Sequence, residues 1–166
     1  MSDLPTAAPA VALPRDGGSV LDISNLRPDW VVLFFYPRDN TSGCTKEALA
    51  FTALQADFAA LDTQVIGISK DSVSSHDKFV AKYQLTVPLL SDESGTVSEA
   101  FGVWKEKSMY GKTYMGIERS TFLINGTGQI VCEWRKVKVP GHAETVLQAL
   151  KELECRVPLH RWQLMS

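Results

Sequence analysis

One apolar run decides the fold: Trp30-Val31-Val32-Leu33-Phe34-Phe35-Tyr36. β-Branched and aromatic residues dominate the run and no polar residue interrupts it, which is typical of a strand covered on both faces. The run is also far shorter than the roughly 20 apolar residues that a membrane-spanning helix needs. We therefore expect a central β-strand that stops at Pro37.

The segment after this strand changes to helical periodicity. A polar loop, 38–43, leads to Cys44, and apolar residues then recur at helical spacing, at Ala48, Phe51, Leu54 and Phe58. Cys44 is therefore expected in or near the first turn of a helix. A second apolar strand at 64–69, followed by good N-cap residues at 71–75 and a further helix, repeats this β-α unit.

The middle of the chain is less regular. Residues 87–91 form a short strand whose proline favours a sheet edge or a strand start, and 95–101 form a short helix that ends at Gly102. We expect 104–118 to be polar and irregular.

The last third follows a β-β-α pattern. Strand-like residues at 120–124 and 130–134 flank the glycine-containing loop 125–129, which predicts a hairpin. Residues 143–153 carry their apolar side chains on one helical face. Alternating β and α segments early, with this β-β-α close, predict an α/β layer fold with a central mixed sheet flanked by helices.

An N-terminal β-hairpin precedes the central strand. Apolar residues at 11–13 and 20–23 flank Arg15-Asp16-Gly17-Gly18, whose glycines can supply the positive φ of a tight turn. The division we expect is a loose N-terminal lead-in at 1–9, one domain at 10–154 and a C-terminal tail at 155–166.

Composition limits the class of protein. The chain has 166 residues, 45% hydrophobic and 22% charged, which fits one compact domain. Its 17 Lys and Arg against 19 Asp and Glu leave a net charge of -2, so neither nucleic acid nor a membrane is an expected partner. The start of the chain carries Asp3 and several prolines in place of a basic and an apolar secretory region, which favours a cytoplasmic protein.

The cysteines and histidines are few and scattered. Cys44, Cys132 and Cys155 are an odd number without a Cys-x-x-Cys pair, which argues against a disulfide framework or a zinc ribbon. The three histidines form no His-x-His or His-Glu-x-x-His pair, so we expect no metal site.

Cys44 has two interpretations on position alone. At the start of a helix, backbone N–H groups and the helix dipole would stabilise its thiolate. Alternatively, it is an ordinary small buried residue, as many free cysteines are.

The residues around Cys44 favour the first interpretation. The stretch Pro37-Arg38-Asp39-Asn40-Thr41-Ser42-Gly43-Cys44 resembles the Pro-x-x-x-Thr-x-x-Cys motif of peroxiredoxins, most closely the bacterioferritin comigratory protein subfamily, also called PrxQ. The likeness continues at 71–73, 101–104 and 119–124 and covers about 13–153. It implies a thioredoxin-like fold and reduction of hydrogen peroxide or organic hydroperoxides without metal, haem or flavin.

The resemblance assigns roles residue by residue. Cys44 is the nucleophile that attacks the peroxide, Thr41 bonds the peroxide, the Gly43-Cys44 turn holds its oxygens, and Pro37 shields the sulfur. Arg119 would lie beside Cys44 and favour its thiolate, although its alternative is a surface charge beside Glu118. Glu47 is either a favourable acid in the first helical turn, which we favour, or a residue that positions Arg119 or the loop.

This sequence departs from the family in how the oxidised cysteine is recycled. Leu49 stands where many PrxQ proteins have the second, resolving cysteine, and the region 74–83 has no cysteine either. Cys132 alternates in phase with Ile130 and Trp134 and is expected to pack, which leaves Cys155 in the tail as the possible resolving residue. Otherwise thioredoxin, glutaredoxin with glutathione, or another external thiol must act.

The resemblance suggests a monomer, and two other functions stay open. One is a peroxide-sensing or holdase module without efficient turnover. The other is a thiol-disulfide oxidoreductase, which the missing Cys-x-x-Cys weakens.

Overall fold

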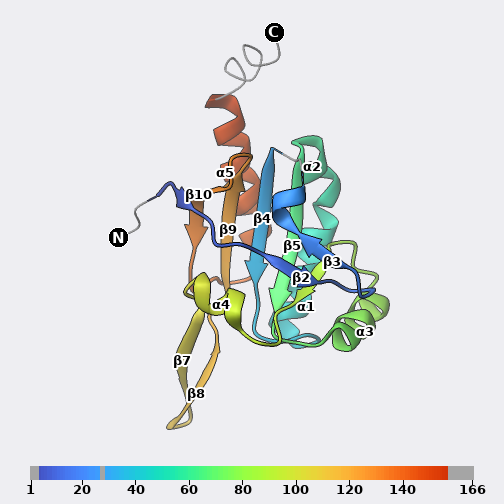
Figure 1. The fold of residues 1–166 in the computed structure, drawn as a ribbon, viewed down its shortest axis with the longest axis vertical. Coiled ribbons are helices and arrows are strands. Elements are labelled where there is room, and N and C mark those ends of the chain that lie inside the picture. Colours follow the sequence, from blue (N-terminus) through green and yellow to red (C-terminus); the bar gives the residue numbers. More distant parts are fainter. Residues whose placement is uncertain (1–3, 27–28, 157–166) are drawn as a thin grey trace.

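A six-stranded mixed sheet in the order β1-β10-β9-β4-β5-β6 forms the centre of the molecule (Figure 1). The computed structural model describes residues 4–26 and 29–156, with only the backbone for 155 and 156. The strands of the sheet are β1 (Thr6–Ala7), β4 (Trp30–Phe35), β5 (Thr63–Ser69), β6 (Leu89–Ser91), β9 (Ser120–Asn125) and β10 (Gln129–Trp134). This confirms the thioredoxin-like class with a central mixed sheet.

The apolar run at 30–36 is the central strand, as predicted. All six residues of β4 are buried, and β4 pairs parallel with β5 and antiparallel with β9. Alternate side chains of β4 enter two separate cores because successive residues point to opposite faces. Phe34, for example, packs in one core and Phe35 in the other.

Different elements cover the two faces of the sheet. One core contains side chains from the helices α1 (Ser42–Ala53), α2 (Gln55–Ala60), α3 (Val73–Tyr83) and α5 (His142–Arg156). The other contains side chains from the hairpin β2 (Ala12–Pro14) and β3 (Val20–Asp22), the short helix η1 (Ile23–Asn25) and α4 (Thr96–Ala100). The helical face therefore carries α1, whose N-terminus holds Cys44.

The N-terminal segment reaches both edges of the sheet. Thr6 and Ala7, expected to lie in a loose lead-in, pair with β10 as strand β1. At the opposite edge Arg15 forms a bridge with Leu90 of β6, and Asp16 N–H donates to the carbonyl of Leu89 at 2.9 Å. The predicted hairpin β2–β3 lies between these two contacts and is confirmed.

The segment expected to be irregular is a hairpin, so that prediction was wrong. Strands β7 (Trp104–Met109) and β8 (Lys112–Ile117) pair in register and project from the body (Figure 1). Tyr110 and Gly111 form the two-residue turn, both with positive φ, as a tight hairpin loop requires. Because both faces are largely exposed, the segment lacks the apolar alternation that marks a half-buried strand.

A register shift between Ile130 and Cys132 changes the expected phase of β10. Ile130 packs in the core opposite the helices, whereas Cys132 and Trp134 contact the core on the helical face. The predicted alternation of Cys132 with Ile130 is therefore wrong, because the bulge places one extra residue between them. The packing role predicted for Cys132 agrees with its half-buried position.

Helix α5 is longer than predicted. It extends to Arg156, so the backbone of Cys155 belongs to its last turn rather than to the tail, while the side chain of Cys155 lies outside the described residues. Within the described ranges, none of the helices combines the length and the apolar character needed to cross a bilayer.

Candidate active site

Cys44 is the third residue of α1, immediately beyond the loop that leaves β4. The N-cap of α1 is Thr41, whose carbonyl accepts from the N–H of Thr45 at 2.9 Å. The first N–H groups of a helix lack intrahelical acceptors and carry the positive end of its dipole. The Cys44 side chain is 2% exposed, so its thiolate would depend on these groups and on Arg119 rather than on bulk water.

Arg119 reaches Cys44 from the start of β9, 75 positions away in the sequence. Its Nη2 lies 3.3 Å from the sulfur of Cys44, in hydrogen-bond contact. Glycine at position 43 permits this approach, since a Cβ there would lie 3.2 Å from the same Nη2. The surface-charge alternative for Arg119 is therefore wrong, and the predicted neighbourhood of Cys44, Gly43 and Arg119 is present.

Glu47 bonds the other terminal nitrogen of the Arg119 guanidinium. Its Oε1 lies 2.7 Å from Nη1 of Arg119, and its side chain is 1% exposed. Burial raises the pKa of Glu47 to about 7, against the opposing charge and hydrogen bond of Arg119. Glu47 is the sixth residue of α1, not part of its first turn, so our favoured interpretation was wrong and the positioning alternative fits.

Thr41 and Pro37 lie in the loop before Cys44, and the Thr41 side chain bonds within that loop. The Thr41 hydroxyl donates to the carbonyl of Arg38 at 3.1 Å. A hydroxyl has one proton, so donation toward the sulfur requires rotation of this side chain. Pro37 is half-buried directly after Tyr36, at the point where β4 turns into the loop.

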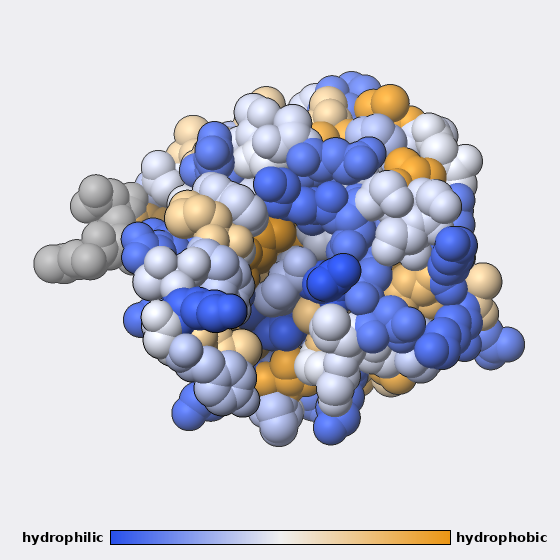
Figure 2. Space-filling view, turned by 90° about the horizontal axis from the view of Figure 1, so that it is seen from below, coloured by the Kyte–Doolittle hydropathy of each residue, from blue (hydrophilic) through white to orange (hydrophobic). Residues whose placement is uncertain are grey.

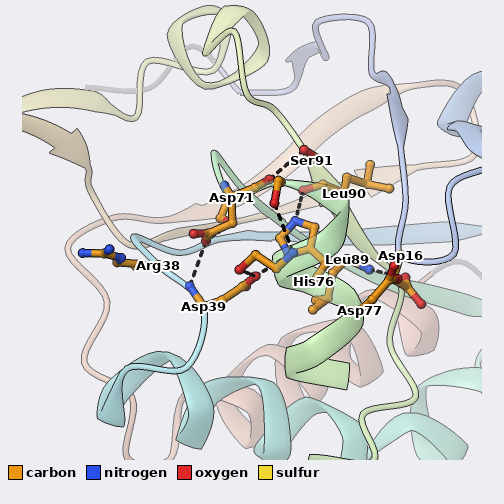
Figure 3. Close-up of polar contacts among 12 residues, drawn as sticks. Asp16, Arg38, Asp39, Asp71, His76, Asp77, Leu89, Leu90 and Ser91 are labelled. Carbon is orange, nitrogen blue, oxygen red and sulfur yellow. Dashed lines mark hydrogen bonds and ion pairs between the residues drawn. The ribbon is translucent and has the colours of Figure 1, made fainter. Parts of the chain in front are cut away.

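Asp39, which the sequence analysis did not single out, anchors the loop to the rest of the fold (Figure 3). Its Oδ2 accepts from Ser75 at 2.8 Å and lies 2.7 Å from Nδ1 of His76. Its Oδ1 accepts from the Tyr36 hydroxyl at 2.6 Å, and its N–H donates to Asp71 at 2.8 Å. The loop between Pro37 and Thr41 is thereby fixed to the first turns of α3.

His76 is completely buried between two acceptors (Figure 3). Nδ1 contacts the carboxylate of Asp39, and Nε2 lies 2.9 Å from the carbonyl of Leu90. Both nitrogens must therefore carry a proton, which makes the ring an imidazolium. Burial opposes this charge, but the hydrogen bond and charge of Asp39 raise the pKa of His76. A sequence signal was available, since His76 is in helical phase with Phe79 and Val80 on the inner face.

His142 lies behind the site at the start of α5. Its Nε2 is 2.8 Å from the hydroxyl of Thr121. Burial first, and the charge of Arg119 second, lower the pKa of His142 to about 4. His142 is therefore neutral where His76 is charged.

The two remaining cysteines differ in what the structure says of them. Cys132 is half-buried, and burial raises its pKa, so it is a poor nucleophile. The residue before Cys155, Glu154, accepts at 2.7 Å from the indole N–H of Trp30, at the start of β4. Cys44 follows the other end of β4, which spans about 17 Å at typical strand geometry. The helix thus ends beside the start of β4, at the opposite end of that strand from Cys44.

No group of three or more His, Cys, Asp and Glu side chains that could hold a metal ion occurs among residues 4–26 and 29–154.

Comparison with known proteins agrees with this geometry. Residues 5–132 match the model of the AhpC/TSA family. Peroxiredoxin Bcp of Xanthomonas campestris is 48% identical over 149 residues, covering 90% of this chain and 93% of that protein. Peroxiredoxin Bcp of Bacillus subtilis is 47% identical over 146 residues, covering 88% and 93%.

Solved structures show the same likeness. The bacterioferritin comigratory protein of Xanthomonas campestris, studied for alkyl peroxide reduction, has a TM-score of 0.81 at 48% identity over 86% of this chain and 90% of that one. A cysteine-to-serine mutant of Xylella fastidiosa PrxQ has a TM-score of 0.83 at 44% identity, covering 91% and 98%. With a family model and full-length relatives in agreement over nearly the whole fold, this chain belongs to the AhpC/TSA family and, within it, to the Bcp or PrxQ peroxiredoxins.

Proposed function

We propose that this protein is a thiol-dependent peroxidase that reduces hydrogen peroxide and organic hydroperoxides through Cys44. The observation that carries the proposal is the 3.3 Å contact between Nη2 of Arg119 and the sulfur of Cys44, at a helix N-terminus. A fixed cation and a helix dipole at one sulfur favour its thiolate, the reactive form of cysteine.

The first half of the cycle is a displacement at oxygen. The thiolate of Cys44 attacks one peroxide oxygen, the S–O bond forms, the O–O bond breaks, and the leaving alkoxide or hydroxide takes up a proton. Cys44 is oxidised to the sulfenic acid while the peroxide is reduced to alcohol or water. Arg119 stabilises the charge on the leaving oxygen, Thr41 and the N–H groups at Gly43 hold the peroxide, and Pro37 keeps water from the sulfur.

The second half requires an external thiol in this proposal. The first thiol condenses with the sulfenic acid, giving a mixed disulfide and water, and a second thiol releases Cys44 as the reduced thiol. Leu49 and the cysteine-free helix α3 support this cycle, and so does the end of α5, which lies at the opposite end of β4 from Cys44. Thioredoxin, or glutaredoxin with glutathione, is the candidate reductant. The likeness to PrxQ proteins suggests a monomer, and an unpaired reactive cysteine suits a reducing compartment such as the cytoplasm.

Mass spectrometry after one equivalent of hydrogen peroxide tests the proposal. We expect a dimedone adduct on Cys44 in the wild type and none in the folded Cys44→Ser variant, which should also lack peroxidase turnover. A loss of two hydrogens with Cys44 linked to Cys155 would instead establish an internal resolving cysteine. If Cys44 stays reduced, the peroxidase proposal fails. If Cys44 is oxidised but neither thioredoxin nor glutaredoxin with glutathione reduces it again, the protein is a peroxide sensor or holdase instead.

A further inference from the structure

A cationic cavity of about 450 Å³ opens beside the Cys44 site, between the β7–β8 hairpin and the segment after β10. Its charged lining consists of Lys105, Lys107, Arg119, Lys136, Glu106 and Glu118, an excess of two positive charges in a chain whose net charge is -2. Figure 2 views the end of the molecule from which the hairpin projects and shows a hollow with a largely hydrophilic rim.

The cavity and the reactive sulfur share one side chain. Arg119 lines the cavity and also contacts the sulfur of Cys44 through Nη2. Lys107, further along the lining, is within electrostatic range of both: burial and the charge of Arg119 lower the pKa of Lys107, and the charge of Cys44 opposes them. A ligand held here therefore lies against Arg119, the side chain that contacts the sulfur.

Lys107 has a supported position on the hairpin. It lies opposite Tyr114 in the β7–β8 register, and its Cδ would be 3.2 Å from a Cβ at position 116, which is glycine. The aliphatic stem thus packs across β8, so the ammonium group has less freedom than one on an unsupported surface side chain.

The three lysines of the cavity are available to a ligand. Within the described part of the chain, the ion pairs with a nitrogen–oxygen distance of up to 4.0 Å are formed by Arg15, His76, Arg119 and Arg135. None of these pairs involves Lys105, Lys107 or Lys136. Cations that form no ion pair but share a concave surface attract anions over several ångströms, and here they outnumber the two carboxylates of the lining, Glu106 and Glu118. The cavity is therefore suited to a small anionic group.

We propose that this cavity binds the carboxylate of a small acidic thiol, the reductant of the Cys44 sulfenic acid. The proposal rests on the proposed peroxidase function. The thiolate attacks the sulfur of the sulfenic acid, an S–S bond forms, the S–O bond breaks, and the leaving hydroxide takes a proton to become water. A second thiol then reduces the mixed disulfide. Because Cys44 is 2% exposed, Arg119 must shift to admit the thiol.

A series of thiols that differ in charge tests the assignment. Protein oxidised with one equivalent of hydrogen peroxide is mixed with 3-mercaptopropionate, 2-mercaptoethanol or cysteamine, and formation of the mixed disulfide is timed by quenching and mass spectrometry. Rates are compared per thiolate. We expect the anionic thiol to react at least tenfold faster than cysteamine at low salt, with the advantage shrinking at high salt.

Charge-reversed variants identify the cavity as the source of that preference. Lys105→Glu combined with Lys136→Glu should abolish or invert it. Lys78→Glu combined with Lys151→Glu changes the net charge equally at exposed positions outside the cavity lining and should keep it. An undiminished preference in the first double variant would overturn the proposal.

Two further experiments distinguish failure of the peroxidase function from failure of the assignment of the cavity to a thiol. Oxidation by neutral hydrogen peroxide should proceed equally in all variants, and its absence in the wild type would defeat the peroxidase function itself.

A carboxylate-bearing hydroperoxide is compared with tert-butyl hydroperoxide, because both a thiol and a peroxide could supply the carboxylate. If only the acidic hydroperoxide responds to the cavity variants, the assignment to the thiol is overturned.

Discussion

At the scale of single residues, Arg119 divides its guanidinium between two partners. Nη1 bonds Glu47 and Nη2 contacts Cys44, so the charge state of Glu47 changes how much of the cation is left for the sulfur. With its pKa raised to about 7 by burial, Glu47 gains its charge as pH rises through neutrality. The added negative charge then disfavours the thiolate.

Replacing Glu47 should therefore simplify the pH dependence of Cys44. In the wild type, the rate of Cys44 alkylation by iodoacetamide should show an inflection near pH 7 that follows the titration of Glu47. Glu47→Gln is uncharged but can still accept from Arg119, so it should lose the inflection and change the peroxide rate only a few-fold. Glu47→Ala, which leaves Nη1 without this partner, should slow oxidation about tenfold or more. Persistence of the inflection in both variants would assign it to another group.

Sequence reasoning located some of these residues and not others. Cys44 and Arg119 were identified because a multi-residue motif surrounds each of them. Glu47 was misassigned because its bond to Arg119 joins residues 72 positions apart, and local helix rules contain no information on such a contact. Asp39 was quoted within the motif, but its role appears only when the strand ends and α3 are brought together.

At the scale of elements, α3 and the loop after β4 are joined by one buried cation. His76 on α3 bonds Asp39 in the loop and the carbonyl of Leu90 on β6, so a single side chain connects three elements. Tyr83 adds a second link by donating to Asn40 at 2.9 Å, which supports the positive φ of Asn40. Loss of the cation should loosen the loop as a unit.

His76→Gln should cost about 2–4 kcal/mol at pH 6, because it leaves Asp39 buried without its cation. A raised pKa in the folded state means that the stabilisation is complete below the unfolded pKa of about 6.5 and is lost as pH rises through the folded value. The stability gap between wild type and variant should therefore narrow at alkaline pH. Urea unfolding at pH 6 and pH 9 measures it, with the exposed Lys78→Gln as control. An unchanged gap would mean that His76 is neutral.

The β7–β8 hairpin carries an unfavourable turn residue. Tyr110 has a φ of 53° and is 97% exposed, so it bears the cost of a left-handed conformation without compensating burial. Tyr110→Asn should stabilise the hairpin by about 0.5–1 kcal/mol, and Gly111→Ala should destabilise it, because Gly111 also needs a positive φ. Hydrogen exchange of the β7 and β8 amides should slow in the first variant and quicken in the second. Equal exchange in both would rule out the turn as the limiting element.

This hairpin also shows where element prediction fails. The β4, β5 and β9 strands are buried, and their apolar residues revealed them. In β7 and β8 most side chains are exposed, so pairing depends strongly on the turn geometry, and Tyr-Gly is a weak signal for it.

At the scale of the whole molecule, two buried histidines in different charge states contribute in opposite directions to the pH dependence of stability. His76 is charged and favours the fold at low pH, while His142 is neutral and favours it at high pH. The sheet order and the two cores follow from alternating β and α segments. The charge states of His76 and His142 do not follow from that pattern, because each depends on groups that distant elements contribute.

The thermal midpoint of the wild type should fall relative to that of His142→Gln as pH decreases from about 6.5 toward 4. Glu47, whose pKa is raised in the fold, acts in the opposite direction over this range, but it does so in both proteins and cancels in the comparison. The pKa of His142 is lowered to about 4 in the fold, so its protonation in this range occurs first in the unfolded chain and draws the equilibrium toward it. His142→Gln, which can still bond Thr121, lacks this titrating group and should not show the loss. His76→Gln should flatten the alkaline part of the pH curve instead. Identical curves for the two variants would contradict the opposite assignments.

The N-terminal segment affects how molecules associate with one another. Its strand β1 covers one edge of the sheet, and Arg15 and Asp16 cover the other. Open strand edges present unpaired N–H and C=O groups on which another chain can add a strand and begin a fibril. Here the short N-terminal segment contacts both edge strands, β10 through β1 and β6 through Arg15. Shortening the chain by its first eight residues would leave the catalytic residues in place, yet it would uncover β10 and turn a self-limited fold into a seed for aggregation.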